Sequence, residues 1–221
     1  MKRSTDRILT THAGSLPRPP DLTQMMYDRA DRKPVDQAKL EERIDSATAE
    51  VVRKQMECGL DVIHDGEFSK VGYSTYVTDR LTGFQGESEP IIAAEMQDYP
   101  EYWQRMFADQ VMEGFTHLKT PACTGPVSLK DPTAVQRDID TFRAAIEGAQ
   151  PVDTFFTAAS PGVIAVFFRN RHYPSEEAYL GALADAMKPG TKPSPRPASS
   201  FSSTVQTWPW PARWETAPIR I

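Results

Sequence analysis

A helix pattern that ends at a glycine and runs directly into a short apolar segment is the feature that most constrains this fold. Between residues 36 and 58, apolar residues recur mostly at three- and four-residue steps, which predicts an amphipathic helix. Gly59 follows at once and supplies the helix stop. Residues 60–64 then suit a buried strand that ends at Asp65-Gly66-Glu67. The apolar helix positions are Leu40, Ile44, Ala47, Val51 and Met56.

The same alternation of strand and helix patterns continues on both sides of this segment. Residues 7–12 are rich in apolar and β-branched types and precede a loop rich in glycine and proline, so we expect a first strand there. Residues 68–114 are irregular and rich in aromatic residues, which indicates a long excursion. The remaining expected elements are strands over 115–120 and 153–158 and helices over 132–148, with Asp131 as cap, and 175–187.

Strands that alternate with helices predict a parallel sheet, because each crossover helix returns the chain to the same end of the sheet. A barrel and a doubly wound sheet both satisfy this pattern. The barrel is favoured because unusual residues follow the expected strands, where a barrel places its site; they are Gly14-Ser15, Glu67, Gly125 and Ser160. No Gly-x-Gly-x-x-Gly follows the first strand. Since a complete (β/α)₈ barrel takes about 250 residues, we expect residues 1–187 to form the N-terminal half of a TIM barrel.

The composition changes sharply after Met187. Seven of the 19 prolines lie in residues 188–221, and neither a helix nor an inner strand tolerates that density. We therefore expect an irregular, Pro-rich tail. An alternative is that the tail is read out of frame, since back-translation from Thr191 with chosen codons gives a buried strand followed by an acidic loop in the expected place of the next barrel unit.

Net charge and apolar content exclude several classes of function. The net charge of −5 leaves no basic surface for nucleic acid. No apolar run is long enough for a membrane span or a signal peptide, so we expect a cytoplasmic protein without a membrane partner. Two cysteines, Cys58 and Cys123, make neither a disulfide framework nor a Cys-x-x-Cys metal site.

Four motifs occur in the order found in the cobalamin-independent methionine synthase family, which this chain resembles over about 180 residues. They are Thr10-Thr11-His12-Ala13-Gly14-Ser15-Leu16-Pro17-Arg18, Gly59-Leu60-Asp61-Val62-Ile63-His64-Asp65-Gly66-Glu67, Cys123-Thr124-Gly125-Pro126 and Ala159-Ser160-Pro161-Gly162. Each motif is short, and the ordered set carries the resemblance. The shifted reading frame of the tail contains a string similar to the family's next motif.

The resemblance implies a barrel enzyme in which zinc binds a substrate thiol and presents the thiolate to a methyl or alkyl donor. It also implies that Ser15 and Glu67 contact the amino-acid substrate. A carboxylate holds an ammonium group, and a hydroxyl with loop amides holds a carboxylate. Arg18 is a third candidate, for an anionic substrate group or for a structural ion pair. His12 and His64 lie near this site, but packing is the simpler interpretation of both.

This sequence departs from the family at the metal. The zinc ligands of such enzymes include a His-x-Cys pair and a further cysteine, and no His-x-Cys occurs here, so we assign no zinc ligand and expect an inactive fragment. The leading hypothesis is a methyltransferase acting on homocysteine. The alternatives are a thiol alkyltransferase that uses coenzyme M, and a non-catalytic fragment or binding module whose Pro-rich tail docks onto a partner.

Overall fold

The structure is a computed structural model, and it describes residues 4–72, 76–88, 98–108, 121–191 and 201–205. The strand expected over 115–120 lies outside these residues, as do 192–200 and 206–221 of the tail. The statements below concern the described residues.

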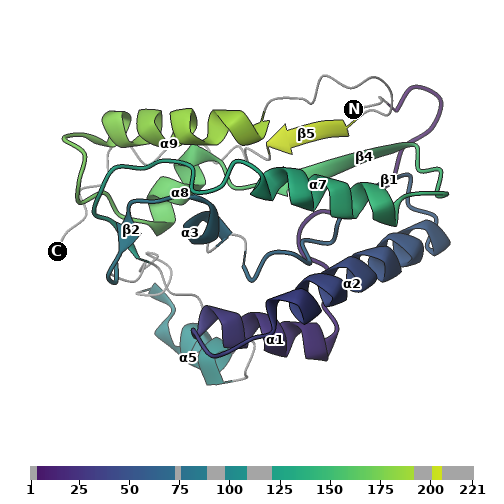
Figure 1. The fold of residues 1–221 in the computed structure, drawn as a ribbon, viewed down its shortest axis with the longest axis horizontal. Helices are drawn as coiled ribbons and strands as arrows, with labels where there is room; N and C mark the ends of the chain where they lie inside the picture. The colour runs from purple at the N-terminus through teal and green to yellow at the C-terminus, as the bar shows by residue number, and fades with distance from the viewer. Residues whose placement is uncertain (1–3, 73–75, 89–97, 109–120, 192–200, 206–221) are drawn as a thin grey trace.

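Three parallel strands form one sheet in the described part of the chain (Figure 1). The strands β1 (Val62–Ile63), β4 (Asp153–Ala158) and β5 (Phe201–Val205) lie in that order, and both pairings are parallel. The strand expected over 7–12 appears as one parallel bridge, from Thr11 to Val62. The order across the sheet is therefore the Thr11 bridge, β1, β4 and β5. This is also their order along the chain, as in successive βα units.

Helices connect these strands: α2 (Gln37–Glu57), α7 (Ala134–Ala145), α8 (Pro161–Phe167) and α9 (Glu176–Thr191). The prediction for α2 is confirmed to within one residue at each end, because its end signals are local. The Asp36 side chain accepts a hydrogen bond from the Lys39 N–H, and Gly59 takes a φ of 77° that ends the helix. The helix α7 begins at Ala134, two residues later than expected.

One face of the sheet packs against α2 and α7, which lie side by side in Figure 1. Ile63 of β1 packs with Val52 of α2 and Phe142 of α7. Phe156 of β4 meets Phe142 edge to face, with 5.1 Å between ring centroids. This cluster makes α7 the crossover that returns the chain from β1 to β4.

The strand expected over 115–120 lies outside the described residues, and the described part of the unit expected around residues 115–148 adds no strand to the parallel sheet. Its strand β3 (Ala122–Cys123) pairs antiparallel with β2 (Phe84–Gln85), and β4 pairs directly with β1. Beside this antiparallel pair, the backbones of Gly83 and Gly125 approach closely: a Cβ on Gly83 would lie 2.7 Å from the Gly125 carbonyl oxygen. The helices α1 (Pro20–Ala30), α3 (Tyr76–Arg80) and α5 (Pro100–Ala108) complete the described elements.

The tail also differs from the expectation of an irregular segment. The helix α9 continues past Met187 to Thr191, and β5 pairs with β4 along five residues. The residues of β5, Phe-Ser-Ser-Thr-Val, contain no proline and lie between Pro197 and Pro209. A strand is possible there because the high proline density of the tail is interrupted at this point.

Candidate functional site

Two loops meet at the carboxyl ends of the first strands. The Leu16 N–H donates to the Gly66 carbonyl oxygen at 3.1 Å, which ties the loop after Thr11 to the loop after β1. The Ser15 hydroxyl donates to Glu67 Oε2 at 2.6 Å. The structure therefore brings together two of the three residues that the sequence singled out, 52 positions apart.

Glu67 is buried, with 2% of its surface exposed, and it has an unusual backbone conformation. Its φ is 61°, directly after Gly66 at 68°, so two consecutive residues occupy the left-handed region. A residue with a Cβ is rarely found there unless its surroundings hold it. The Glu67 N–H donates to Asp65 Oδ1 at 3.1 Å, and the Glu67 carbonyl accepts from Arg18 at 3.0 Å.

Arg18 contacts the backbone of this loop. Its Nη2 donates to the carbonyl oxygens of Glu67, at 3.0 Å, and Lys70, at 2.5 Å. Burial lowers the pKa of Arg18, and the charge of Glu67 opposes that change. These contacts hold the loop in shape, and a role for Arg18 in binding an anionic group stays a prediction.

Sequence reasoning missed two residues of this site, Thr157 and Lys70. The Thr157 hydroxyl, at the end of β4, donates to Glu67 Oε1 at 2.5 Å. Lys70 is 4% exposed, and its Nζ donates to the Thr157 carbonyl at 2.9 Å and to the Thr157 hydroxyl at 3.2 Å. The signal was present for Thr157: carboxyl ends of parallel strands meet at one edge, and Thr157 stands near the end of an expected strand.

Asp65 is a second buried carboxylate next to Lys70. Its Oδ2 lies 3.9 Å from Lys70 Nζ. Burial opposes ionisation of Asp65, but the charge of Lys70 and the hydrogen bond from the Glu67 N–H keep its pKa below the ordinary value. The Lys70 ammonium group therefore forms an ion pair with Asp65 and is linked to Glu67 through the hydrogen bonds of the Thr157 hydroxyl.

Three rings lie next to one another at this end of the sheet, those of His12, His64 and Phe155. His12 and His64 stack with 5.8 Å between centroids, and His64 lies 5.0 Å from Phe155. The Gly66 N–H donates to His64 Nδ1, so a neutral His64 carries its proton on Nε2. Among the described residues, Nε2 of His64 and Nε2 of His12 have no hydrogen-bond partner.

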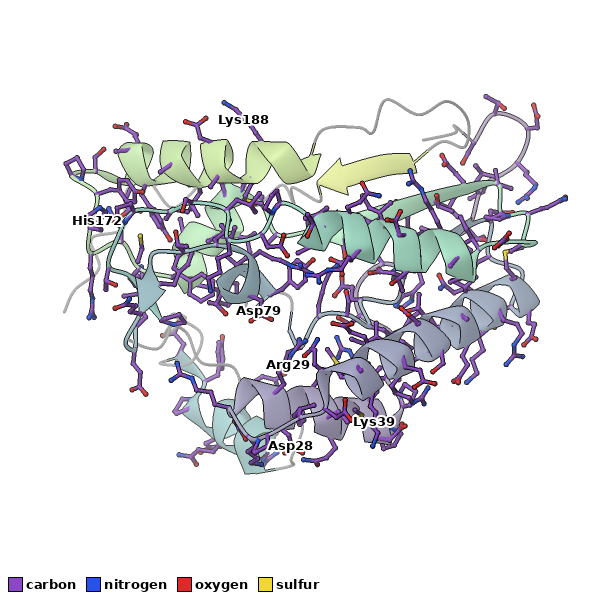
Figure 2. The ribbon with its side chains drawn as sticks, in the orientation of Figure 1. Asp28, Arg29, Lys39, Asp79, His172 and Lys188 are labelled. Carbon is purple, nitrogen blue, oxygen red and sulfur yellow. The ribbon has the colours of Figure 1, made fainter. Side chains whose placement is uncertain are left out.

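A cleft of about 830 Å³ opens between α1, α2, α3 and α7, and its lining includes Ser69 and Val71 but neither Ser15 nor Glu67. Arg29 and Asp79 approach each other from α1 and α3, 3.7 Å apart (Figure 2). Asp138 accepts from the Tyr76 hydroxyl and, at 2.8 Å, from Arg80. Burial raises the pKa of Asp138, and the Arg80 guanidinium counteracts this.

The comparison with protein families decides what kind of chain this is. Residues 8–154, more than half of the chain, match the family model described as the cobalamin-independent synthase catalytic domain. The chain belongs to this family. The methionine synthase of Sulfolobus acidocaldarius is 26% identical over 168 residues, which are 76% of this chain and 42% of the relative. A 5-methyltetrahydropteroyltriglutamate–homocysteine methyltransferase of Synechococcus sp. strain JA-2-3B'a(2-13) is 39% identical over 77 residues, 34% of this chain and 10% of the relative.

Solved structures of B12-independent methionine synthases share the fold. The protein from Shewanella sp. W3-18-1, solved in complex with selenomethionine, has a TM-score of 0.57 at 20% identity. The similarity covers 80% of this chain and 45% of the Shewanella protein, so this chain spans less than half the length of such relatives. Among the described residues, none of the helices is long and apolar enough to cross a membrane.

The described residues do not fit the zinc site that family membership implies. They contain no group of three or more His, Cys, Asp or Glu side chains placed to hold a metal ion. Cys58 is exposed at the end of α2, and the Cys123 thiol is buried and donates to the Gly125 carbonyl. Burial raises the pKa of Cys123, which disfavours the thiolate that zinc binds.

Proposed function

We propose that this chain forms the N-terminal half of a (β/α)₈ barrel in a methyltransferase that moves a methyl group to the thiol of homocysteine. In this proposal, Glu67 binds the ammonium group of the amino acid, and Ser15 contacts the same amino acid. The main support for this proposal is the buried Glu67 carboxylate. One of its oxygens accepts a hydrogen bond from Ser15, and the other accepts one from Thr157. The selenomethionine in the Shewanella relative is an amino acid of the kind that such a site would bind.

The chemistry of Glu67 suits a cationic group. A carboxylate accepts about four hydrogen bonds, and the two hydroxyl donors leave further lone pairs for the N–H groups of an ammonium. Ser15 is exposed whereas Glu67 is buried, so a ligand would approach from the Ser15 side. Charge-assisted hydrogen bonds of this kind are the strong ones in a site shielded from water.

The same carboxylate discriminates between the two enzyme hypotheses. Coenzyme M carries a sulfonate and no ammonium group, so Glu67 would repel it. The ammonium group of homocysteine would place a positive charge next to the Glu67 carboxylate. The geometry around Glu67 therefore favours the amino-acid thiol over coenzyme M.

Binding measurements on matched ligands test this proposal. Isothermal titration of the full chain should detect L-homocysteine but neither N-acetyl-homocysteine, which lacks the ammonium charge, nor coenzyme M. Replacing Glu67 by Gln should raise the dissociation constant about tenfold or more, since a hydrogen bond to a charged group is worth about 1.5–3 kcal/mol. Equal affinity of wild type and E67Q for L-homocysteine would refute the assignment. Binding of none of the three ligands would favour the non-catalytic binding module.

We further propose that the chain alone does not catalyse methyl transfer, because it contains no His-x-Cys pair and no metal-ligand group among its described residues. No step is assigned to zinc. The shifted-frame interpretation of the tail remains a proposal as well. Sequencing the gene across codons 186–191 tests it: an uninterrupted frame would exclude that interpretation.

A further inference from the structure

The oxygen Oε1 of Glu67 is held by a residue from a distant part of the chain. Thr157 follows Glu67 by 90 positions, and its hydroxyl lies 2.5 Å from that oxygen. Thr157 itself is 3% exposed. The contact exists because β4 pairs with β1 in parallel, so both strands end beside the same loop.

Lys70 determines the direction in which the Thr157 hydroxyl donates its hydrogen bond. An ammonium group has donors and no acceptor, so Thr157 Oγ1 can only accept the 3.2 Å hydrogen bond from Lys70. A hydroxyl has one proton, and Thr157 therefore donates it to Glu67. Lys70 is in turn fixed by its 2.9 Å bond to the Thr157 carbonyl and by Asp65.

We infer that Thr157 and Lys70 are positioning residues that hold Glu67 as an oriented anion ready to receive a cationic group. This inference rests on the proposed function, since it deepens the role given there to Glu67. Ser15 orients Oε2 of the Glu67 carboxylate. Lys70 and Thr157, whose linked hydrogen bonds we call the Lys70–Thr157 relay, orient Oε1. Neither relay residue needs to touch the ligand.

The test compares Thr157→Val, which removes the hydroxyl at nearly constant volume, with Thr157→Ser, which keeps it. Thr154→Val is the matched control, because it is the same change on the same strand at a position facing the opposite side of the sheet. The first readout needs no ligand: the side-chain carboxyl ¹³C signal of Glu67 in the full chain, assigned by its loss in E67Q. The second is the dissociation constant for L-homocysteine.

We expect the Glu67 signal to move toward that of free glutamate in T157V and to stay near the wild-type position in T157S and T154V. The dissociation constant should rise about tenfold in T157V and change less than about twofold in T157S and T154V. Lys70→Met should move the signal in the same direction; if that variant does not fold in a thermal melt, the Thr157 pair carries the test. An unchanged Glu67 signal in T157V would overturn the inference. A shifted signal in a chain that binds no L-homocysteine would support the relay and refute the proposed function.

Discussion

Thr11 and Val62 form a parallel bridge, and the Thr11 hydroxyl donates to the Val62 carbonyl at 2.8 Å. This pairing fixes the register between the first two strand segments. Ser15 lies four residues beyond the bridge and Glu67 five residues beyond it, so both loops leave the sheet at the same level. The bridge thereby sets the distance between the two side chains of the proposed amino-acid site.

The lowered pKa of Asp61 predicts that the protein loses stability in acid. Hydrogen bonds from Arg7, and then from the Thr10 N–H, hold the pKa of Asp61 well below its ordinary range. A carboxyl with a depressed folded-state pKa stabilises the fold above its unfolded pKa of about 3.9. That contribution is lost as the pH falls further. The melting temperature of Asp61→Asn should be lower than that of wild type near pH 7, and the difference should shrink below about pH 4. An equal difference at both pH values would contradict the prediction.

Arg32 offers a change that should stabilise the protein. It is exposed and has a φ of 60°, a conformation that glycine adopts without steric cost. We expect Arg32→Gly to raise the free energy of unfolding by about 0.5–1 kcal/mol in urea titrations. Arg53→Gly, in the interior of α2, is the control and should lower the same quantity by about 1 kcal/mol. Equal effects of both changes would count against the left-handed conformation at Arg32.

Tyr76→Phe tests the buried polar cluster beside the cleft. The change removes the hydrogen bond from Tyr76 to Asp138 and leaves Arg80 in place. We expect a loss of about 1–3 kcal/mol in the free energy of unfolding, because the buried carboxylate of Asp138 loses a donor. Tyr99→Phe should have no measurable effect, since Tyr99 is 65% exposed. A neutral result for Tyr76→Phe would mean that Asp138 finds another donor.

Phe142→Ala tests the packing of α7 on the sheet. Phe142 is fully buried and touches Phe156 edge to face. Truncation should cost about 3–5 kcal/mol in chemical denaturation. Val166→Ala, at a residue 53% exposed, should change stability by less than about 0.5 kcal/mol. If both variants unfold at the same denaturant concentration, α7 does not cover the sheet as described.

Elements with local signals were predictable from the sequence, and long-range pairings were not. The strand over 153–158 and the helix α2 are found where their patterns place them. The antiparallel pairing of Phe84 with Cys123 has no local signal, because it depends on contacts between segments far apart in the chain. The meeting of Ser15 with Glu67 was expected from the resemblance. Lys70 was missed because a lysine in a loop is ordinarily solvated, whereas here it is buried against Thr157 at the end of β4.

The pairing of Val62 with Asp153 also has a consequence for the rate of folding. It joins residues 91 positions apart, with the antiparallel pair β2–β3 and the helix α7 in the intervening segment. The entropy of closing that loop is lost before β4 gains contacts along its length. We therefore expect α1 and α2 to form early, and β4 to join the sheet in a slow step that leaves the edge of β1 exposed to other chains in the meantime.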